Sequence, residues 1–290
     1  MTDPLESCEQ DRFAFGKNWQ AFLTALDESR IEQAVASLVD RLGVDSLEGT
    51  TFLDIGSGSG LFSLAAHRLG AHVTSIDYDT ESVACTNELK HRFACKDAIA
   101  DETGAWSGTW TVQQGSVLDE ALMDSLGEFD VVYSWGVLHH TGEMQRAVRI
   151  ASERVSDGGK FFIAIYNDQG GGSRRWLAIK KLHHALPQPL RVVWVLMVAG
   201  FYELLFALSR LLKFRNPLPF ADWGAKKKDR GMSVWHDWVD WIGGLPFQVA
   251  TPEAVILPLR QKGFVLDDLV TVRSGWGCNE YVFSLRRDVL

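Results

Sequence analysis

The chain has 290 residues, of which 46% are hydrophobic and 23% charged, enough apolar material for one large domain or a domain with a sizeable insertion. Its formal net charge of −8 argues against a general nucleic-acid binder, so we expect no DNA partner. The four cysteines form no CxxC pair and are expected to be reduced, structural thiols. Because residues 1–6 lack the basic and apolar regions of a signal peptide, we predict a cytoplasmic protein.

The predicted elements begin with helices at 20–26 and 29–42, and strands and helices then alternate. The strands are predicted at 51–55, 72–76, 109–114, 129–134 and 159–166, and the helices between them at 60–69, 80–93, 118–125 and 142–155. The turn Ser-Asp-Gly-Gly at 156–159 is expected to precede the fifth strand. Strict alternation predicts an α/β fold with a parallel, doubly wound sheet that binds ligands at the carboxyl ends of its strands.

A long helical and aromatic stretch interrupts the alternation after Tyr166. Only then do a helix at 252–263 and strands near 264–271 and 280–286 follow. We therefore divide the chain into an N-terminal helical cap at 1–48, an α/β core at 49–168, a helical insertion at 169–250 and a C-terminal completion of the sheet at 251–290. Placed after the fifth strand, the insertion is a candidate lid over the ligand-binding edge.

A glycine-rich loop follows the first predicted strand. Its three glycines, Gly56, Gly58 and Gly60, let main-chain N–H groups approach a ligand at the start of the next helix. The spacing does not fit the dinucleotide pattern G-x-G-x-x-G, because Leu61 or Ser63 occupies the third glycine position. The second strand ends in an acid suited to a ribose diol, so the loop predicts a site for a nucleoside cofactor.

The fourth strand leads into a second distinctive segment, Ser134-Trp135-Gly136-Val137-Leu138-His139-His140. Together, the glycine loop, this segment and the Gly158-Gly159 turn resemble class I S-adenosylmethionine (SAM)-dependent methyltransferases over about residues 50–165. Within that superfamily, the chain resembles the small-molecule methyltransferases of quinone and natural-product biosynthesis. The resemblance implies a Rossmann-like methyltransferase fold with seven strands, the last of them antiparallel.

The resemblance also implies SAM as cofactor and S-adenosylhomocysteine as product. Gly56 and Gly58 would lie against the methionine part, and Asp77 would bind the ribose. Tyr78 would flank the adenine, and Ser116 and Val117 would line its edge. An aromatic wall could attract the sulfonium. The complete predicted cofactor set is Asp54, Gly56, Gly58, Gly60, Asp77, Tyr78, Ser116, Val117, Ser134, Trp135 and Trp19.

Catalysis is predicted at His139 and His140, just past the fourth strand. A hydroxyl or ammonium acceptor must lose a proton, which a neutral imidazole can take. One of the two histidines could face the acceptor while its neighbour packs or caps the next helix, and we expect His139→Ala to lower turnover far more than SAM binding. The residues predicted to bind the acceptor are Tyr166, Asn167, Trp235, His236, Asp240, Trp241 and Asn279. His236 and Asp240 would share a helix face, but two ligands do not make a metal site, and we predict none.

The insertion is basic, with twelve Lys/Arg against five Asp/Glu between residues 171 and 250. Its apolar run at 192–212 approaches transmembrane length, although Glu203 and Arg210 interrupt it. Three readings remain open: a buried lid helix, which we favour; a membrane-surface helix or acceptor tunnel; and a spanning helix. Basic residues between 174 and 230 either form a solvated basic face or contact anionic headgroups or an acidic acceptor. Contact with headgroups would place the protein at the periphery of the membrane.

The function predicted from these features is SAM-dependent methylation of a small-molecule or lipid-like acceptor, at oxygen, with a histidine as base. N-methylation of a small metabolite and a non-catalytic SAM-binding regulatory protein are the alternatives. A tRNA acceptor is supported only by the basic insertion. The segment Ser134-Trp135-Gly136-Val137 replaces the Asn/Asp-Pro-Pro-Tyr motif of DNA and protein amide N-methyltransferases, which disfavours nucleobase amines.

Overall fold

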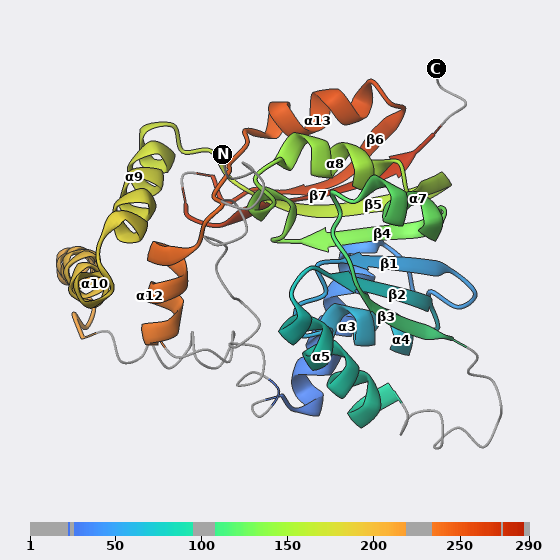
Figure 1. Cartoon of the computed structure of the whole chain (residues 1–290), viewed down its shortest axis with the longest axis horizontal. Helices are drawn as coiled ribbons and strands as arrows, with labels where there is room; N and C mark the ends of the chain where they lie inside the picture. Colours follow the sequence, from blue (N-terminus) through green and yellow to red (C-terminus); the bar gives the residue numbers. More distant parts are fainter. Residues whose placement is uncertain (1–22, 24–25, 95–107, 219–233, 274, 287–290) are drawn as a thin grey trace, which may run out of the picture. The chain divides into compact units, whose positions relative to one another are not determined.

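The protein was analysed as a computed structural model, which describes residues 23, 26–94, 108–218, 234–273 and 275–286, apart from four side chains in the helix at 234–243. A sheet of seven strands forms its centre (Figure 1). In chain order they are β1 (Thr51–Ile55), β2 (His72–Asp77), β3 (Trp110–Gln114), β4 (Phe129–Trp135), β5 (Val155–Tyr166), β6 (Phe264–Val270) and β7 (Cys278–Leu285). The spatial order is β3-β2-β1-β4-β5-β7-β6. The strands β1–β5 run parallel and β7 is antiparallel to both its neighbours, so the predicted fold class is confirmed.

Helices cover both faces of the sheet (Figure 1). One face carries α3 (Glu28–Leu42), α4 (Leu61–Arg68) and α5 (Thr80–Leu89), which a π-helical turn, η1 (Lys90–Ala94), extends. The other carries α7 (Glu120–Leu126), α8 (Met144–Ser152) and α13 (Pro252–Arg260). The strands supply both cores by alternation: Phe52 lies in the cluster beneath α3 and α4, whereas its neighbour Leu53 lies in the cluster beneath α8.

Acidic and hydroxyl side chains define where several helices begin. Asp79 accepts a hydrogen bond from the amide of Glu81 at 2.9 Å, and Asp119 accepts one from Leu122 at 3.1 Å. Such side chains satisfy amide groups that have no partner within the helix. These caps start α5 and α7 immediately after the loops that follow β2 and β3, and so set the length of both loops.

The turn at 156–159 was predicted to precede the fifth strand. In the structure it lies inside that strand, β5. Phe129 pairs with Val155 and Val131 with Lys160, so four residues of β5 bulge out opposite one residue of β4. Gly158 takes a positive φ of 76° at the bulge, and the Ser156 hydroxyl donates to Asp130 at 3.3 Å. A bulge accommodates turn-forming residues without ending the strand, which is why the sequence signal was misleading.

The described residues fall into two compact units. The sheet unit comprises Phe15–Gln169 and Pro246–Leu290, and the helical unit comprises Gly170–Leu245. The segment 246–250, expected in the insertion, therefore belongs with the sheet, where Ala250 bridges to Asn167 and its amide donates to the Tyr166 carbonyl at 3.0 Å. Helix α3, expected in a cap at 1–48, also belongs to the sheet unit, and of the expected helix at 20–26 only Leu23 and Leu26 are described.

The helical unit contains α9 (Gly171–Ala185), α10 (Gln188–Leu212) and α12 (Val234–Gly243) (Figure 1). The expectation that the apolar run at 192–212 forms a buried helix is wrong for most of its length. Only four residues of α10 are buried: Val195, Val198, Ala199 and Tyr202. Among the described helices, α10 alone is long and apolar enough to cross a membrane, with a mean hydropathy of 2.0 and 22% of its most apolar window buried. Apolar periodicity predicts a helix but does not say what covers it.

Candidate active site

The carboxyl ends of the parallel strands bring the predicted cofactor residues to one edge of the sheet. The glycine loop follows β1, with φ angles of 79° at Gly56, 56° at Gly58 and 80° at Gly60. A Cβ at Gly56 would lie 2.4 Å from the Val137 side chain, and one at Gly60 would lie 2.8 Å from Thr86. These positions therefore require glycine for two reasons, the left-handed backbone and the lack of space.

Asp77, at the end of β2, holds the loop in place. Its Oδ2 accepts a hydrogen bond from the Gly58 amide at 2.9 Å, and its Oδ1 accepts one from the Asp79 amide at 2.9 Å. A carboxylate oxygen has room for a further donor beside each of these amides. Asp77 can therefore take the predicted ribose hydroxyls while it still contacts the loop.

Asp54 lies beneath the loop in a buried polar chain. Its Oδ2 accepts from the Ser63 hydroxyl, which contacts Ser75 at 2.7 Å, and the Trp110 indole donates to Ser75 at 2.8 Å. Burial raises the pKa of the Asp54 carboxyl to about 7; the Ser63 hydrogen bond opposes this rise and the charge of Asp77 adds to it. Asp54, predicted to contact the cofactor, is only 3% exposed and ties β1 to α4.

The end of β4 lies beside the glycine loop at the same edge of the sheet. The buried Ser134 donates to the Ile55 carbonyl at 2.9 Å and so joins β4 to the start of the glycine loop. Trp135 is 43% exposed, and its indole donates to Glu280 of β7 at 3.1 Å. Glu280 in turn pairs with Arg41 of α3 at 3.3 Å. An indole oriented by a hydrogen bond at one edge can present its face to a cation.

The two histidines lie in a short 3₁₀ helix, η2 (Leu138–His140), shortly after β4. The His139 ring centroid is 4.4 Å from that of His140 and 4.0 Å from that of Tyr166 at the end of β5. The segment at 246–248 packs against these rings. The Gln248 main-chain amide donates to the His139 carbonyl at 3.1 Å, and the ring centroids of Phe247 and Tyr166 are 5.5 Å apart. The structure therefore brings His139, His140 and Tyr166 together, as predicted.

Burial and hydrogen bonding distinguish the two imidazoles. His139 is fully buried, whereas His140 is partly exposed. The His140 Nδ1 lies 2.7 Å from the Pro246 carbonyl oxygen. Because a carbonyl oxygen only accepts, Nδ1 must carry the proton, and neutral His140 has its lone pair on Nε2. That tautomer is the one that a proton acceptor of fixed orientation requires.

The side chains of Asn167 and Asn279 form hydrogen bonds to other groups of the protein. The Asn279 amide nitrogen donates to Asn167 Oδ1 at 3.1 Å, and the Asn279 oxygen accepts from the Val272 amide at 3.0 Å. The Asn167 amide donates to the Arg273 carbonyl at 2.6 Å. These bonds hold the loop between β6 and β7 against the end of β5, and the buried Asn279 has no surface to offer an acceptor.

The remaining predicted residues are placed as follows. Tyr78 is 40% exposed after β2, and after β3 the Ser116 hydroxyl accepts from the Leu118 amide at 3.1 Å beside the buried Val117. In the helical unit, Trp235 is exposed and Trp241 stacks on Trp176 at 5.6 Å. Trp19 and the side chains of His236 and Asp240 lie outside the described part of the chain.

Sequence reasoning missed three residues that shape this site: Thr86, Pro246 and Glu280. Thr86 donates to the Gly58 carbonyl at 3.2 Å and contacts Ser57 at 3.0 Å. Each contacts the site from far along the chain, so no local motif marks them. Within the described residues, no group of three His, Cys, Asp or Glu side chains could hold a metal ion.

Comparison with known proteins agrees with this geometry. A family model described as "Methyltransferase domain" matches residues 27–202, more than half of the chain, and the chain therefore belongs to that family. The chain thus carries a class I SAM-dependent methyltransferase domain.

Among curated relatives, the ubiquinone biosynthesis O-methyltransferase of Methylobacterium sp. (strain 4-46) is 32% identical over 128 residues, 44% of this chain and 45% of the relative. That of Xanthomonas oryzae pv. oryzae (strain PXO99A) is 28% identical over 166 residues, 55% of this chain and 61% of the relative. The chain thus spans about half to three fifths of the length of these relatives. The structure of PKMT2 from Rickettsia typhi in complex with AdoHcy shares the fold, with a TM-score of 0.54 at 13% identity, over 89% of this chain and 53% of that one.

SAM is the cofactor, and the residues at the sheet edge fit it. The glycine loop lets the cofactor approach the main chain, because it has no Cβ atoms at positions where a Cβ would collide. Asp77 offers carboxylate oxygens to the ribose diol.

Proposed function

We propose that the protein transfers a methyl group from SAM to an oxygen atom of a small-molecule or lipid-like acceptor, and that His140 removes the acceptor's proton. The hydrogen bond from His140 Nδ1 to the Pro246 carbonyl carries this proposal, because it fixes the basic nitrogen at Nε2 in a partly exposed ring. His139, which the sequence analysis expected to matter most, is buried and packs against Tyr166. We assign it a positioning role.

SAM supplies a methyl group on a sulfonium, and the reaction neutralises that charge. The chain's own contribution is therefore alignment of the two reactants and exclusion of water. Asp77 and the glycine loop would hold the cofactor, and Trp135 would face its cationic end. Tyr166 would orient the acceptor beside His140.

Oxygen is favoured over nitrogen because the curated relatives are O-methyltransferases of ubiquinone biosynthesis. A phenolic hydroxyl, which ordinarily titrates near pH 10, needs a base at neutral pH. Acceptor binding by Trp235, His236, Asp240 and Trp241 of the helical unit belongs to the same proposal. Contact with a membrane through residues 174–230 is a separate one.

The test is a transfer assay with isotope-labelled SAM and a panel of phenols, polyprenyl phenols and primary amines, followed by identification of the labelled product. Label on a phenolic oxygen is expected, together with stoichiometric release of S-adenosylhomocysteine. Label only on amines would replace the proposal with N-methylation.

A further inference from the structure

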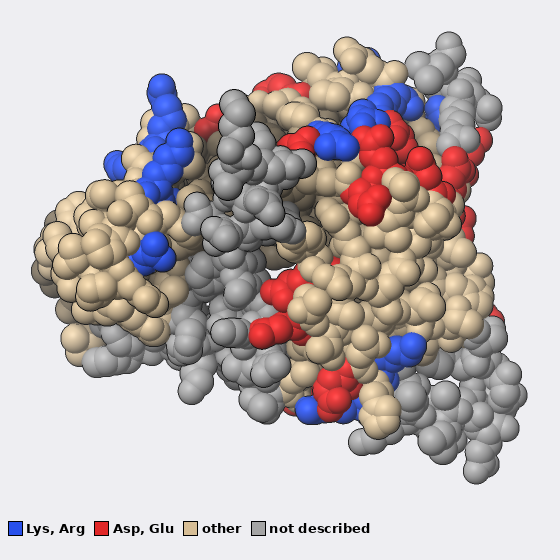
Figure 2. Space-filling view, viewed as in Figure 1, with Lys and Arg blue, Asp and Glu red and all other residues tan. Residues whose placement is uncertain are grey.

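The outer face of α10 is apolar along its whole length. Seven of its apolar side chains are more than half exposed: Val192, Leu196, Met197, Phe201, Leu204, Leu211 and Leu212. Figure 2 shows this surface as continuous tan over α10, at the left of the view. An exposed apolar surface of this extent marks a place where a protein meets another apolar body.

The opposite side of α10 is fixed by packing within the helical unit. The ring of the buried Tyr202 stacks on Trp176 of α9 at 5.1 Å and on Trp238 of α12 at 6.1 Å. These aromatic contacts set the rotation of the helix about its own axis. The apolar outer face is thus held outward by the fold rather than exposed by chance.

Charged side chains are kept away from that face. Arg191 donates to the Leu186 carbonyl at 2.9 Å, and Arg210 donates to the Pro217 carbonyl at 3.1 Å. Glu203 accepts from the Trp238 indole at 3.3 Å, on the packed side. At 100° per residue, all three lie off the row formed by Met197, Leu204 and Leu211.

The charges around the face select its partner. Residues 170–218 contain eight Lys/Arg and a single acid, Glu203, although the whole chain carries −8. Five of these cations are exposed at the ends of α10 or on α9: Arg174, Arg175, Lys181, Lys213 and Arg215. A second copy would set like charges against each other, whereas anionic lipid headgroups would neutralise them.

We propose that α10 lies in the surface of an anionic lipid bilayer, parallel to its plane, with the outer face among the acyl chains and the five cations at the headgroups. This docking concerns where the protein sits, and it does not depend on the acceptor or on the base. Helices with one apolar face and a basic border bind membranes in this way.

The packed side of α10 argues for lying in the surface rather than crossing it. With 25 residues, the helix is about 37 Å long, enough to span a bilayer. A spanning helix would take its packed neighbours with it, including the buried Lys180, which donates to the Trp241 carbonyl, and Glu203. Charged groups in the hydrocarbon are costly, so the fold favours the interface.

Vesicle sedimentation of the full chain tests the proposal. The probes are phosphatidylcholine vesicles with and without phosphatidylglycerol, at low and high salt. Wild-type protein is expected to bind the anionic vesicles, less strongly as salt rises. Alkaline carbonate should release it. Failure to bind at low salt, or retention after carbonate as for a spanning helix, would overturn the proposal.

Matched variants assign the binding to α10. The variant M197S/F201S/L204S should bind anionic vesicles at least about tenfold more weakly, because it removes apolar side chains that would enter the bilayer. The control Leu257→Ser removes an equally exposed apolar side chain from α13 and should leave binding unchanged. R174Q/R175Q/K181Q should remove most of the salt dependence. All variants should bind S-adenosylhomocysteine as wild type does, which shows that the sheet unit is folded.

Two results would replace the bilayer with another partner. Equal binding by the triple serine variant and wild type would place membrane contact elsewhere. A concentration-dependent dimer that this variant abolishes, without vesicle binding, would assign the face to a second copy of the chain.

Discussion

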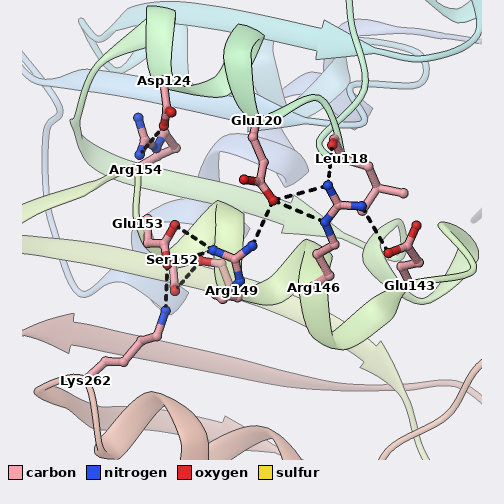
Figure 3. A network of polar contacts seen from close by, with 10 residues as sticks. All are labelled: Leu118, Glu120, Asp124, Glu143, Arg146, Arg149, Ser152, Glu153, Arg154 and Lys262. Atoms are coloured by element: carbon pink, nitrogen blue, oxygen red, sulfur yellow. Dashed lines mark hydrogen bonds and ion pairs between the residues drawn. The ribbon is translucent and has the colours of Figure 1, made fainter.

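The outer faces of α8 and α10 show two different solutions for a surface helix. On α8, Arg146 pairs with Glu120 and Glu143, and Arg149 pairs with Glu120 and Glu153, at 2.9–3.3 Å (Figure 3). On α10, apolar side chains occupy the corresponding face. Both helices bury an apolar stripe, so the inner face alone does not distinguish them. The outer face indicates the medium, water for α8 and an apolar surface for α10.

The same contrast separates the two units. The sheet unit holds the glycine loop, Asp77 and the histidines, and we assign cofactor binding and proton removal to it. The helical unit holds α10 and its basic border, and we assign docking to it. Substitutions in the sheet unit should therefore change turnover or cofactor affinity, and substitutions on α10 should change vesicle binding alone.

The largest effect is expected at His140. His140→Ala should lower the turnover number about 100-fold or more, because it removes the base, while calorimetry should show unchanged affinity for S-adenosylhomocysteine. The increase of rate with pH that follows from forming neutral imidazole should disappear in this variant.

His139→Ala is the matched control. Loss of a buried ring should destabilise the protein by about 1–3 kcal/mol and lower turnover less. If His139→Ala reduces turnover as much as His140→Ala at unchanged stability, the base is His139. Unchanged turnover in both variants would exclude a base in this pair.

A second effect is expected at the glycine loop. Gly56→Ala should weaken S-adenosylhomocysteine binding at least about tenfold, because its Cβ would meet Val137 and displace the loop that holds the cofactor. Gly43→Ala is the control, since Gly43 is also left-handed, with a φ of 62°, and has nothing within 4 Å of a Cβ. Both should cost about 1–2 kcal/mol of stability through backbone strain. Equal cofactor affinity in the two variants would contradict the assigned role of the loop.

A third effect concerns the pH dependence of stability. The folded-state pKa of Asp54, about 7, lies above its ordinary value of 3.8. Between these two pH values the folded protein keeps the carboxyl protonated, whereas the unfolded chain has lost that proton. The stability that this proton contributes is fully present below about pH 4 and is lost as the pH rises to about 7. Asp54→Asn should therefore gain stability relative to wild type across that window, by at most about 1.4 kcal/mol per pH unit. Denaturant titrations that show a constant difference between the two proteins would refute the raised pKa.

The smallest effect is expected on α8. Glu120→Gln removes a partner of both Arg146 and Arg149, yet exposed ion pairs contribute little, so the denaturation midpoint should be nearly unchanged. Turnover and vesicle binding should not change. A marked loss of either would show that the two outer faces are less distinct in function than in composition.

Much of the sheet could be predicted because local patterns define strands and loops. Strand β1 was predicted residue for residue, and the loops after β1, β2 and β4 were placed at one edge from alternation alone. The bulge in β5 was missed, since Gly158 and Gly159 signal a turn equally well inside a strand or before it. The partner of His140, Pro246, lies more than 100 residues away, and no local pattern reveals such a contact. The exposure of Met197 and Phe201 was missed because an apolar helix has the same sequence whether protein or lipid covers it.

Amide hydrogen exchange of the full chain, with and without S-adenosylhomocysteine, tests the central claim most directly. We expect new protection at residues 56–60, 77–79 and 134–140, with α10 unchanged. Protection confined to α9, α10 and α12, or none anywhere at saturating ligand, would contradict the assignment of the cofactor to the sheet edge.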